Sequence, residues 1–429
     1  MCGVVVTEEK IQYAKEILES HMGPGHFYEE GWRHILTAHG GMLPISIKAV
    51  PEGTVVGVKN CLFTMVNTDP KCYWLTNYLE TLMVQVWYPM TVATNSREQK
   101  KVLLQALKAS GGDPTAADLQ LHDFGYRGVS SVESAAIGGA GHLISFHGTD
   151  TLAAIICIKH YYEGGVTKLG PDLTLPVPGI SIPAAEHSTI TSWGRDRELE
   201  AFKNMLEQYP EGIVAVVSDS YNVYEAISTL WGKELKDLIK ARGQRTQPCR
   251  LVVRPDSGDP PVIVPELLKL LVEAFKEDTV KTSTGHILLP SYIRLIQGDG
   301  ISYESLKEIL DATLAAGFAA ENLVFGSGGA LLQKMNRDTQ KCAFKCCEIT
   351  DSTGKCTNVY KDPITDPGKK SKMGKLTVER GPDGKLMTMT EGKGDPAKDV
   401  MVEVFRNGVL QVHQKFEDIR TRCRAETTA

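Results

Sequence analysis

Four segments of the chain share one pattern, in which a short apolar run ends in a polar residue beside serine or glycine. The runs are 213–217, 251–253, 293–296 and 323–325, and they lead into SDS, RPDSG, QGDG and GSGG. Continuous apolar runs of this length are typical of parallel strands that are buried on both faces. The carboxyl ends of such strands carry the chemistry of α/β barrels, so we expect these polar ends to lie together at one face of a barrel.

The strand ends offer a specific set of chemical groups. They carry three carboxylates and one guanidinium, from Asp219, Asp256, Asp299 and Arg254, and the last run leads into the glycine loop 326–329. Glycines let a backbone approach a ligand closely, and the N–H groups of a following helix can bind phosphate. The set predicts a phosphorylated sugar as the ligand, together with a divalent cation. For the glycine loop taken alone, an ordinary strand–turn–helix connection stays open.

Length and composition exclude several classes of protein. A chain of 429 residues predicts two domains. A net charge of -5 and a pI near 6.2 argue against a nucleic-acid-binding protein, which would usually be basic. No apolar run reaches the length of a membrane span, and the N-terminus lacks the apolar region of a signal peptide, so we expect neither.

The cysteines do not form a recognisable metal motif. There are ten, and none forms a CxxC pair. Cys342, Cys346, Cys347 and Cys356 lie close together in the sequence, but no histidine lies near them. We therefore expect reduced thiols rather than a zinc site there, and the sequence assigns no metal ligands.

The two ends of the chain predict a mixed domain with an antiparallel sheet. Turn signals at 381–384 and 407–408 lie between alternating runs, which is typical of β-hairpins. We further expect helices at 8–20 and 73–110, the second broken near Pro89, and strands at 45–50, 54–58 and 62–66.

Three loops add candidate site residues, each with a plainer alternative. Phe124 and Arg127 offer an aromatic face and a cation, or else a core residue and a surface residue. Asp150 opens an apolar helix and could be only its N-cap. His187, in a polar loop, is a candidate for phosphate contact or proton transfer.

Eight motifs resemble those of the nicotinamide phosphoribosyltransferases, a family of type II phosphoribosyltransferases. The resemblance extends from about residue 4 to about residue 420. The motifs are NTDPKCYWL at 67–75, VATNSREQKK at 92–101, LHDFGYRGVSS at 121–131, PAAEHSTIT at 183–191, SDSY at 218–221, RPDSG at 254–258, IQGDG at 296–300 and FGSGG at 325–329.

The resemblance implies both a fold and an activity. The fold is an irregular TIM-like α/β barrel, at 116–345, beside a mixed α+β domain formed by 1–115 with 346–429. The activity is that of a pentosyltransferase, which joins nicotinamide to 5-phosphoribosyl-1-pyrophosphate and releases nicotinamide mononucleotide and pyrophosphate in NAD salvage. The resemblance also implies Mg²⁺, stimulation by ATP through a phosphohistidine, and a homodimer with shared active sites. It implies a cytoplasmic protein without nucleic-acid or membrane partners, and leaves nuclear and extracellular locations open.

The resemblance also assigns roles to individual residues. Phe124 would stack on the pyridine ring, and Asp150 would accept a hydrogen bond from the carboxamide. The implied catalytic residues are His187, Asp219 and Asp256. The implied substrate-binding residues are Phe124, Arg127, Asp150, His187, Arg254, Asp256, Gly298, Asp299, Ser327, Gly328 and Gly329, with Arg337, Lys345 and Lys369 from the second subunit.

Two alternatives to an active transferase remain. The family carries a further segment before the position that corresponds to Met1, with an aromatic residue for the second face of nicotinamide and an arginine near the pyrophosphate. On that comparison we expect the chain as written to be a weakly active or inactive form, or an interaction or cytokine-like protein. A phosphate-binding lyase or isomerase barrel is a second alternative, but it would need a central base that the strand ends do not clearly offer.

Overall fold

The chain folds into two compact units. The computed structural model describes residues 1–163, 177–245 and 249–427. The terminal unit combines Met1–Trp87 with Gln340–Ala429, and the barrel unit is Tyr88–Thr339. The domains expected from the sequence were 1–115 with 346–429, and 116–345. The difference lies mainly in helix α5, Trp87–Ser110, most of which packs with the barrel unit.

A parallel five-stranded sheet forms the centre of the barrel unit. Its strand order is β3-β9-β8-β5-β4, and every neighbouring pair is parallel. The strands are β3 Leu121–Asp123, β4 Ile213–Val217, β5 Arg250–Arg254, β8 Ile293–Gln297 and β9 Leu323–Ser327. The four strands predicted from apolar runs are confirmed, and their polar ends lie at one edge of the sheet.

Short bridges close this sheet into a barrel. Thr149 bridges Asp123 of β3, and the neighbouring Gly148 bridges Ile180. Ala184, a few residues further along, bridges Ala215 of β4. The segment 180–185 therefore connects the two edges of the sheet, and we call it the seam. The predicted fold class, an irregular α/β barrel with a mixed second unit, is confirmed.

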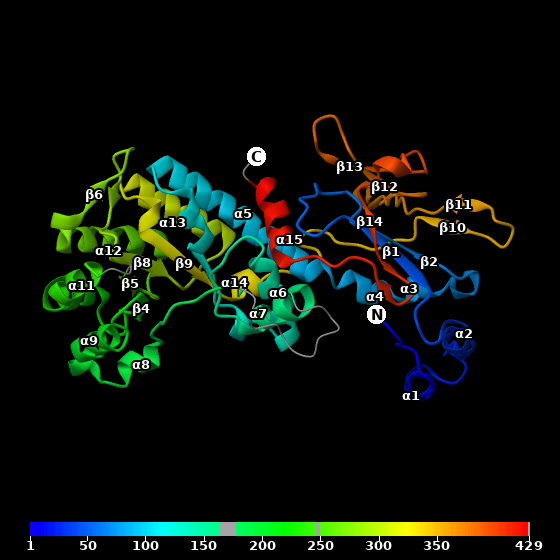
Figure 1. Ribbon diagram of the computed structural model, residues 1–429, viewed down its shortest axis with the longest axis horizontal. Helices are drawn as coiled ribbons and strands as arrows, with labels where there is room; N and C mark the ends of the chain where they lie inside the picture. The colour runs from blue at the N-terminus through cyan, green and yellow to red at the C-terminus, as the bar shows by residue number, and fades with distance from the viewer. Residues whose placement is uncertain (164–176, 246–248, 428–429) are drawn as a thin grey trace. The chain divides into compact units, whose positions relative to one another are not determined.

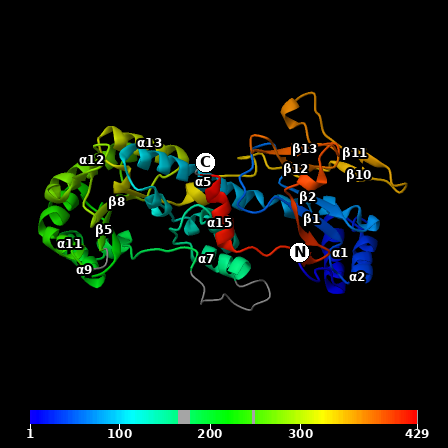
Figure 2. The same cartoon turned by 45° about the horizontal axis from the view of Figure 1, so that its top comes forward.

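Alternate residues of the strands face two different layers. Ala215, Val252 and Ile296 form the inner layer, together with Phe124 and Val324. The residues between them pack outward, beneath a shell of helices. Figures 1 and 2 show this shell outside β4, β5 and β8. Its helices are α9 Glu198–Gln208, α11 Lys236–Gly243, α12 Pro260–Ala274 and α13 Tyr303–Ala315.

Short elements complete the barrel unit. The helices are α6 Val132–His142, α7 Leu152–Ile158, α8 His187–Thr191, α10 Val223–Glu225 and α14 Gly329–Leu332, and a small hairpin joins β6 Val280–Lys281 to β7 Ile287–Leu288. A π-helical segment, Ala226–Glu234, continues α10. This segment therefore has a wider turn than an α-helix.

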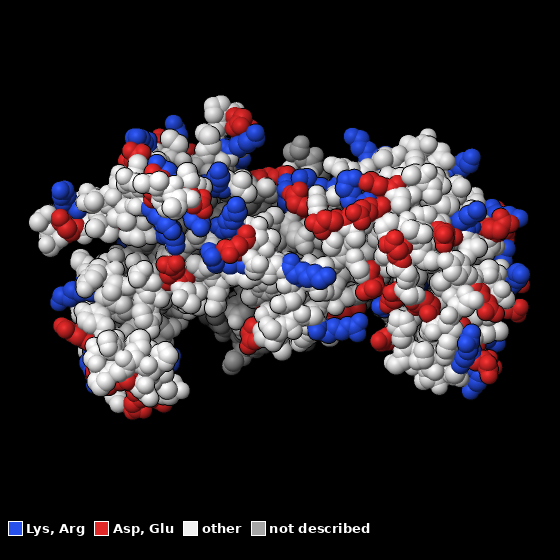
Figure 3. Space-filling model, turned by 180° about the vertical axis from the view of Figure 1, so that it is seen from behind, with Lys and Arg blue, Asp and Glu red and all other residues white. Residues whose placement is uncertain are grey.

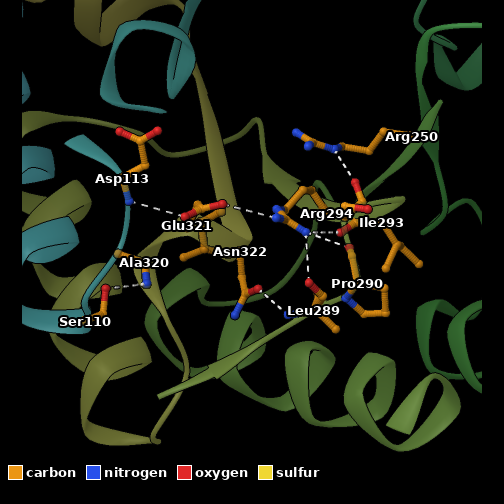
Figure 4. Close-up of polar contacts among 12 residues, drawn as sticks. Ser110, Asp113, Arg250, Leu289, Pro290, Ile293, Arg294, Ala320, Glu321 and Asn322 are labelled. Atoms are coloured by element: carbon orange, nitrogen blue, oxygen red, sulfur yellow. Dashed lines mark hydrogen bonds and ion pairs between the residues drawn. The ribbon is translucent and has the colours of Figure 1, made fainter. Parts of the chain in front are cut away.

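A buried arginine stabilises the amino-terminal end of the strands. Arg294 of β8 donates hydrogen bonds to the carbonyl oxygens of Leu289, Pro290 and Ile293, at 3.2, 2.7 and 2.8 Å (Figure 4). Its second Nη atom lies 3.3 Å from a carboxylate oxygen of Glu321. Burial lowers the pKa of Arg294 to about 10. Polar contacts at this end of a barrel serve stability rather than catalysis.

The terminal unit contains the predicted antiparallel sheet. The sheet has the order β15-β14-β1-β2 and takes strands from both chain ends. Both predicted hairpins are confirmed, since β12 pairs with β13 and β14 with β15. The strands are β1 Ile45–Ala49, β2 Phe63–Asn67, β10 Glu348–Thr350, β11 Cys356–Asn358, β12 Thr377–Arg380, β13 Leu386–Met389, β14 Val402–Arg406 and β15 Val409–Leu410. The helices are α1 Glu8–Met22, α2 Glu29–His39, α3 Leu75–Tyr78, α4 Glu80–Val84 and α15 Phe416–Ala425.

The strand predicted at 54–58 is wrong. This segment is irregular, and Val58 is exposed. Strand β1 already pairs with β14 on one side and β2 on the other, so neither edge of β1 is left for a further strand.

The surface carries charges of both signs. On the face drawn in Figure 3, basic and acidic side chains of the described residues are interspersed over each unit. Among the described residues, no helix combines the length and the apolar character that a membrane crossing requires.

Candidate active site

Asp219 lies at the centre of the strand-end site. It follows β4, and its side chain is only 4% exposed. One carboxylate oxygen lies 3.1 Å from Nε2 of His187, and the other accepts the backbone N–H of Asp256 at 3.0 Å. The three predicted catalytic residues therefore belong to one connected group. On the other side of the ring, the carboxylate of Glu186 lies 3.5 Å from Nδ1, a longer contact than that of Asp219 with Nε2.

Arg254 and Asp256 form a two-pronged ion pair at the end of β5. Nε and Nη2 of Arg254 donate to the two carboxylate oxygens of Asp256, at 2.9 and 2.6 Å. Gly298 makes room for this pair. A Cβ atom at that position would lie 2.8 Å from Oδ1 of Asp256 and 3.0 Å from Nε of Arg254. The first glycine of the QGDG motif, which has no side chain, therefore leaves the space that the ion pair occupies.

Phe124 forms an apolar wall beside this ion pair. The guanidinium carbon of Arg254 lies 5.3 Å from the centroid of the Phe124 ring. The ring also lies against the backbone of Gly326, where a Cβ atom would be 2.0 Å from Cε2 of the ring. The backbone N–H of Phe124 donates to the carbonyl of Ser327 at 2.9 Å, which fixes the loop after β3 against the glycine loop.

Asp150 is oriented by two residues that the sequence analysis did not identify. Nε2 of His122 lies 2.9 Å from its Oδ1, and the hydroxyl of Ser181 donates to the same oxygen. Asp150 is not the cap of α7, which begins after Thr151. Burial alone would raise the pKa of Asp150, but contacts with His122 and Ser181 and the charge of Arg254 lower it overall. The carboxylate therefore stays ionised, and 47% of its side chain is exposed.

A buried carboxylate beneath the site was also missed. Asp123, the last residue of β3, is fully buried. It accepts the N–H of Gly125 at 2.7 Å and the hydroxyl of Thr149 at 3.4 Å. Burial raises the pKa of Asp123, against the effect of these hydrogen bonds. Asp123 fixes the turn that carries Phe124, but neither its spacing nor its neighbours in the sequence mark this role.

The glycine loop presents its backbone rather than its serine hydroxyl. The hydroxyl of Ser327 is buried and donates to the carbonyl of Ile301 at 2.7 Å. A Cβ atom at Gly329 would meet nothing within 4 Å, so space lies in front of that residue. Gly128 packs against the loop, since its Cβ would lie 3.3 Å from Cα of Gly329. Any phosphate here would be bound by main-chain N–H groups, with Arg127 exposed on the neighbouring turn.

The remaining predicted residues are exposed. Asp299 follows the end of β8, as predicted, and its side chain is exposed. Arg337 follows α14 and pairs with Asp338 at 2.8 Å. Lys345 and Lys369 belong to the terminal unit, where their nearest carboxylates are those of Glu80 at 3.6 Å and Asp366 at 3.3 Å. Within the barrel unit, the structure thus brings together the residues predicted at the strand ends.

Comparison with known proteins identifies the family. Residues 119–409 match the model of the nicotinate phosphoribosyltransferase (NAPRTase) family. The chain belongs to this family. Residues 1–47 also match the nicotinamide phosphoribosyltransferase N-terminal domain.

Individual members of the family align over most of the chain. A nicotinamide phosphoribosyltransferase of Xanthomonas campestris pv. campestris is 47% identical over 98% of this chain and 87% of its own. One from Acinetobacter baylyi is 35% identical over 96% of this chain and 82% of its own. The crystal structure of human nicotinic acid phosphoribosyltransferase aligns with 98% of this chain and 82% of its own, with a TM-score of 0.47 and 15% identity. The family predicted from the motifs is confirmed, and the non-catalytic alternative is not favoured.

Proposed function

We propose that this NAPRTase-family chain transfers phosphoribose from 5-phosphoribosyl-1-pyrophosphate to nicotinamide, which yields nicotinamide mononucleotide and pyrophosphate. Two relatives that align over most of the chain are named for this enzyme. The observation that carries the proposal is the ionised Asp150, held by His122 and Ser181 beside the wall of Phe124. A carboxylate accepts a hydrogen bond from an amide NH₂ and repels the carboxylate of nicotinate.

The strand-end carboxylates suit the chemistry of the sugar. As the bond between C1 and pyrophosphate breaks, positive charge develops on the ribose ring. Asp219 and Asp256 form fixed negative charges at the strand ends, and such preorganised charges stabilise a transition state without reorganising. The pyridine nitrogen then forms the new bond to C1, and pyrophosphate leaves with the electron pair.

The donor set also fits a divalent cation. Mg²⁺ prefers oxygen ligands and is usually bound by one or two carboxylates together with substrate phosphates. Asp219, Asp256 and Asp299 supply such oxygens at one edge of the sheet. When bound, Mg²⁺ would neutralise charge on the pyrophosphate.

His187 is the proposed acceptor for ATP coupling. Asp219 contacts Nε2 at 3.1 Å, so it can hold a proton there and leave the lone pair of Nδ1 for attack. Attack by Nδ1 on the γ-phosphorus forms the N–P bond as the bond to ADP breaks. We also propose a homodimer, in which Arg337, Lys345 and Lys369 of one subunit complete the site of the other.

The test is mononucleotide formation by the purified chain, followed by mass spectrometry of the product. Asp256→Asn should lower kcat by about 100-fold or more, because a preorganised charge is lost from the transition state. Asp311→Asn, an exposed aspartate of α13, is the matched control and should retain full activity. If neither the original chain nor the control variant forms the mononucleotide from the two substrates, the proposal is wrong.

ATP coupling is tested separately. His187→Gln should abolish stimulation by ATP and the acid-labile phosphate on the protein, while basal transfer continues. Full ATP stimulation in this variant would contradict the role of His187 and leave the transfer reaction itself in place.

A further inference from the structure

Two histidines, an aspartate and a cysteine converge in the terminal unit. His34 and His39 lie on α2, and Asp69 and Cys72 lie at the short turn that follows β2. One donor atom from each residue lies within 4.8 Å of those from the other three. We propose that these four side chains form a zinc site.

Both imidazoles point at a single oxygen atom. Nε2 of His34 lies 2.6 Å from Oδ2 of Asp69, and Nε2 of His39 lies 2.7 Å from the same oxygen. A carboxylate oxygen can only accept, so without a metal each Nε2 must carry the hydrogen that faces it. A metal ion that replaces these hydrogens would find two imidazole nitrogens and one carboxylate oxygen already gathered in one place.

The backbone fixes the direction of the Asp69 carboxylate. Its other oxygen, Oδ1, accepts the N–H of Lys71 at 2.9 Å. The side-chain amide of Asn67 donates to the carbonyl of Asp69 at 2.8 Å. These contacts hold Oδ2 toward the histidines in the way that outer hydrogen bonds orient the ligands of metal sites.

Cys72 supplies the fourth ligand from the protein interior. The residue is fully buried, whereas the side chains of His34, His39 and Asp69 are 24%, 27% and 18% exposed. The cluster thus has a closed inner side and an outer side through which an ion can enter. Binding would release the thiol proton of Cys72 and leave each imidazole neutral, with its hydrogen on Nδ1.

Packing holds the two ligand-bearing segments together without a metal. The rings of Trp32 on α2 and Trp74 beyond the turn meet edge to face, with centroids 4.8 Å apart. Ile35 of α2 and Leu75 of α3 are both fully buried in the same core. The cluster therefore stands on rigid elements, as a metal site requires.

The ligand types select the class of metal. Two imidazoles, one carboxylate and one thiolate form a borderline-soft set that suits Zn²⁺ and excludes Mg²⁺ or Ca²⁺. Tetrahedral Zn²⁺ separates nitrogen and oxygen ligands by about 3.3 Å, so each imidazole needs to move only about 0.6 Å from Asp69. Four protein ligands leave no open position, so the site would join α2 to the turn rather than catalyse a reaction.

Metal analysis of the full chain tests the proposal. The purified protein is stripped with a chelator, then titrated with Zn²⁺ against a chromophoric competitor, with Mg²⁺ in excess. We expect about one zinc per chain, and, with Co²⁺ instead, a thiolate charge-transfer band together with the strong visible bands of a tetrahedral ion. Absence of tight zinc binding would overturn the proposal.

Matched variants locate the ion. Outer-shell partners alone change metal affinity by 10–100-fold, so His39→Gln and Cys72→Ala should each weaken zinc binding by more than about 100-fold. The exposed residues His21 and Cys346 provide the controls His21→Gln and Cys346→Ala, which should bind zinc like the original chain. Because Cys72 is buried, its replacement could disturb folding, so circular dichroism checks that Cys72→Ala is folded. His39 is partly exposed, so His39→Gln tests zinc binding with less risk to the fold. Unchanged zinc affinity in folded His39→Gln would show that the ion binds elsewhere.

Discussion

The single residue Asp150 is expected to set substrate choice in the proposed reaction. Asp150→Ser removes the acceptor for the amide and the charge that repels nicotinate. Like-charge contact costs several kcal/mol, so the ratio of kcat/KM for nicotinamide over nicotinate should fall by about 10-fold or more. Competition assays with both pyridines measure the ratio.

The control for this change is Asp311→Ser, on the exposed face of α13. It should leave the ratio unaltered. An Asp150→Ser enzyme that turns over nicotinamide with the original ratio would contradict the role of Asp150.

Residue-level prediction from the sequence succeeds where one strand end determines the position. Asp219, Arg254 and Asp299 were placed by the rule that parallel strands end at one edge. His122 and Ser181 carried no such signal, because they become neighbours of Asp150 only when β3, 147–150 and the seam pair with one another. Side chains that meet only through tertiary pairing show no recognisable spacing pattern in the sequence.

At the scale of elements, the start of α9 gives a prediction for pH dependence. Glu198 is its first residue and is buried, and within the described part of the chain its Oε1 has no hydrogen-bond partner. Burial raises the pKa of Glu198 from 4.5 to about 7, and Glu225 adds to this against the opposing charge of Arg195. Between these two values the folded state binds more protons than the unfolded state, so stability falls as the pH rises.

Glu198→Gln should remove this dependence. The variant should gain about 1–2 kcal/mol over the original chain at pH 8, a value discounted for partial solvation of the carboxylate, and little at pH 4. Thermal unfolding at both pH values measures the difference. An equal effect at the two pH values would contradict the assignment.

The amino-terminal end of β8 gives a second prediction at this scale. Arg294→Met removes the guanidinium donor from three carbonyl oxygens and from Glu321, which should destabilise the fold by about 2–4 kcal/mol. The carbonyl of Pro290 keeps the N–H of Ile293, and the carboxylate of Glu321 keeps the N–H of Asp113. KM should not change, because the site lies at the other end of the strands. Urea unfolding measures the first effect and steady-state kinetics the second.

Lys307→Met is the matched control for Arg294→Met. Lys307 pairs with Asp311 on the exposed face of α13, and its removal should change stability by less than about 0.5 kcal/mol. If the two changes lower the stability of the fold equally, the buried contacts of Arg294 contribute no more to stability than an exposed ion pair.

Element boundaries were less predictable than element types. The helical stretch predicted at 73–110, with a break near Pro89, divides into α3, α4 and α5. Pro89 lies in the first turn of α5, where backbone N–H groups have no partner within the helix. A proline there costs no hydrogen bond, so the helix is broken before Pro89 rather than at it. The periodicity showed where a helix forms but not where one ends.

At the scale of the whole molecule, the proposed shared sites predict complementation between two inactive variants. Asp256→Ala and Arg337→Ala should each be poorly active alone. In mixed dimers, one of the two sites would receive both original residues, so an equal mixture should recover about one quarter of full activity. Light scattering establishes the dimer, and activity after unfolding and refolding the mixture gives the test.

The control is each variant unfolded and refolded alone, which should gain no activity over the untreated variant. If the mixture is also inactive although mixed dimers form, Asp256 and Arg337 do not act in one site across two subunits.

The seam is the part of the barrel wall that we expect to open locally most often. The amide of Ile180 is bonded to His147 and that of Ala185 to Ala215, whereas β4 and β5 pair along their whole length. Deuterium should therefore enter at Ile180 and Ala185 well before it enters β5. His187 lies two residues after the seam. If a ligand bound at His187 slows exchange in the seam, linkage requires that a more tightly bonded seam binds that ligand better. Ligand binding at the strand ends could then be followed by the rate of hydrogen exchange at Ile180 and Ala185.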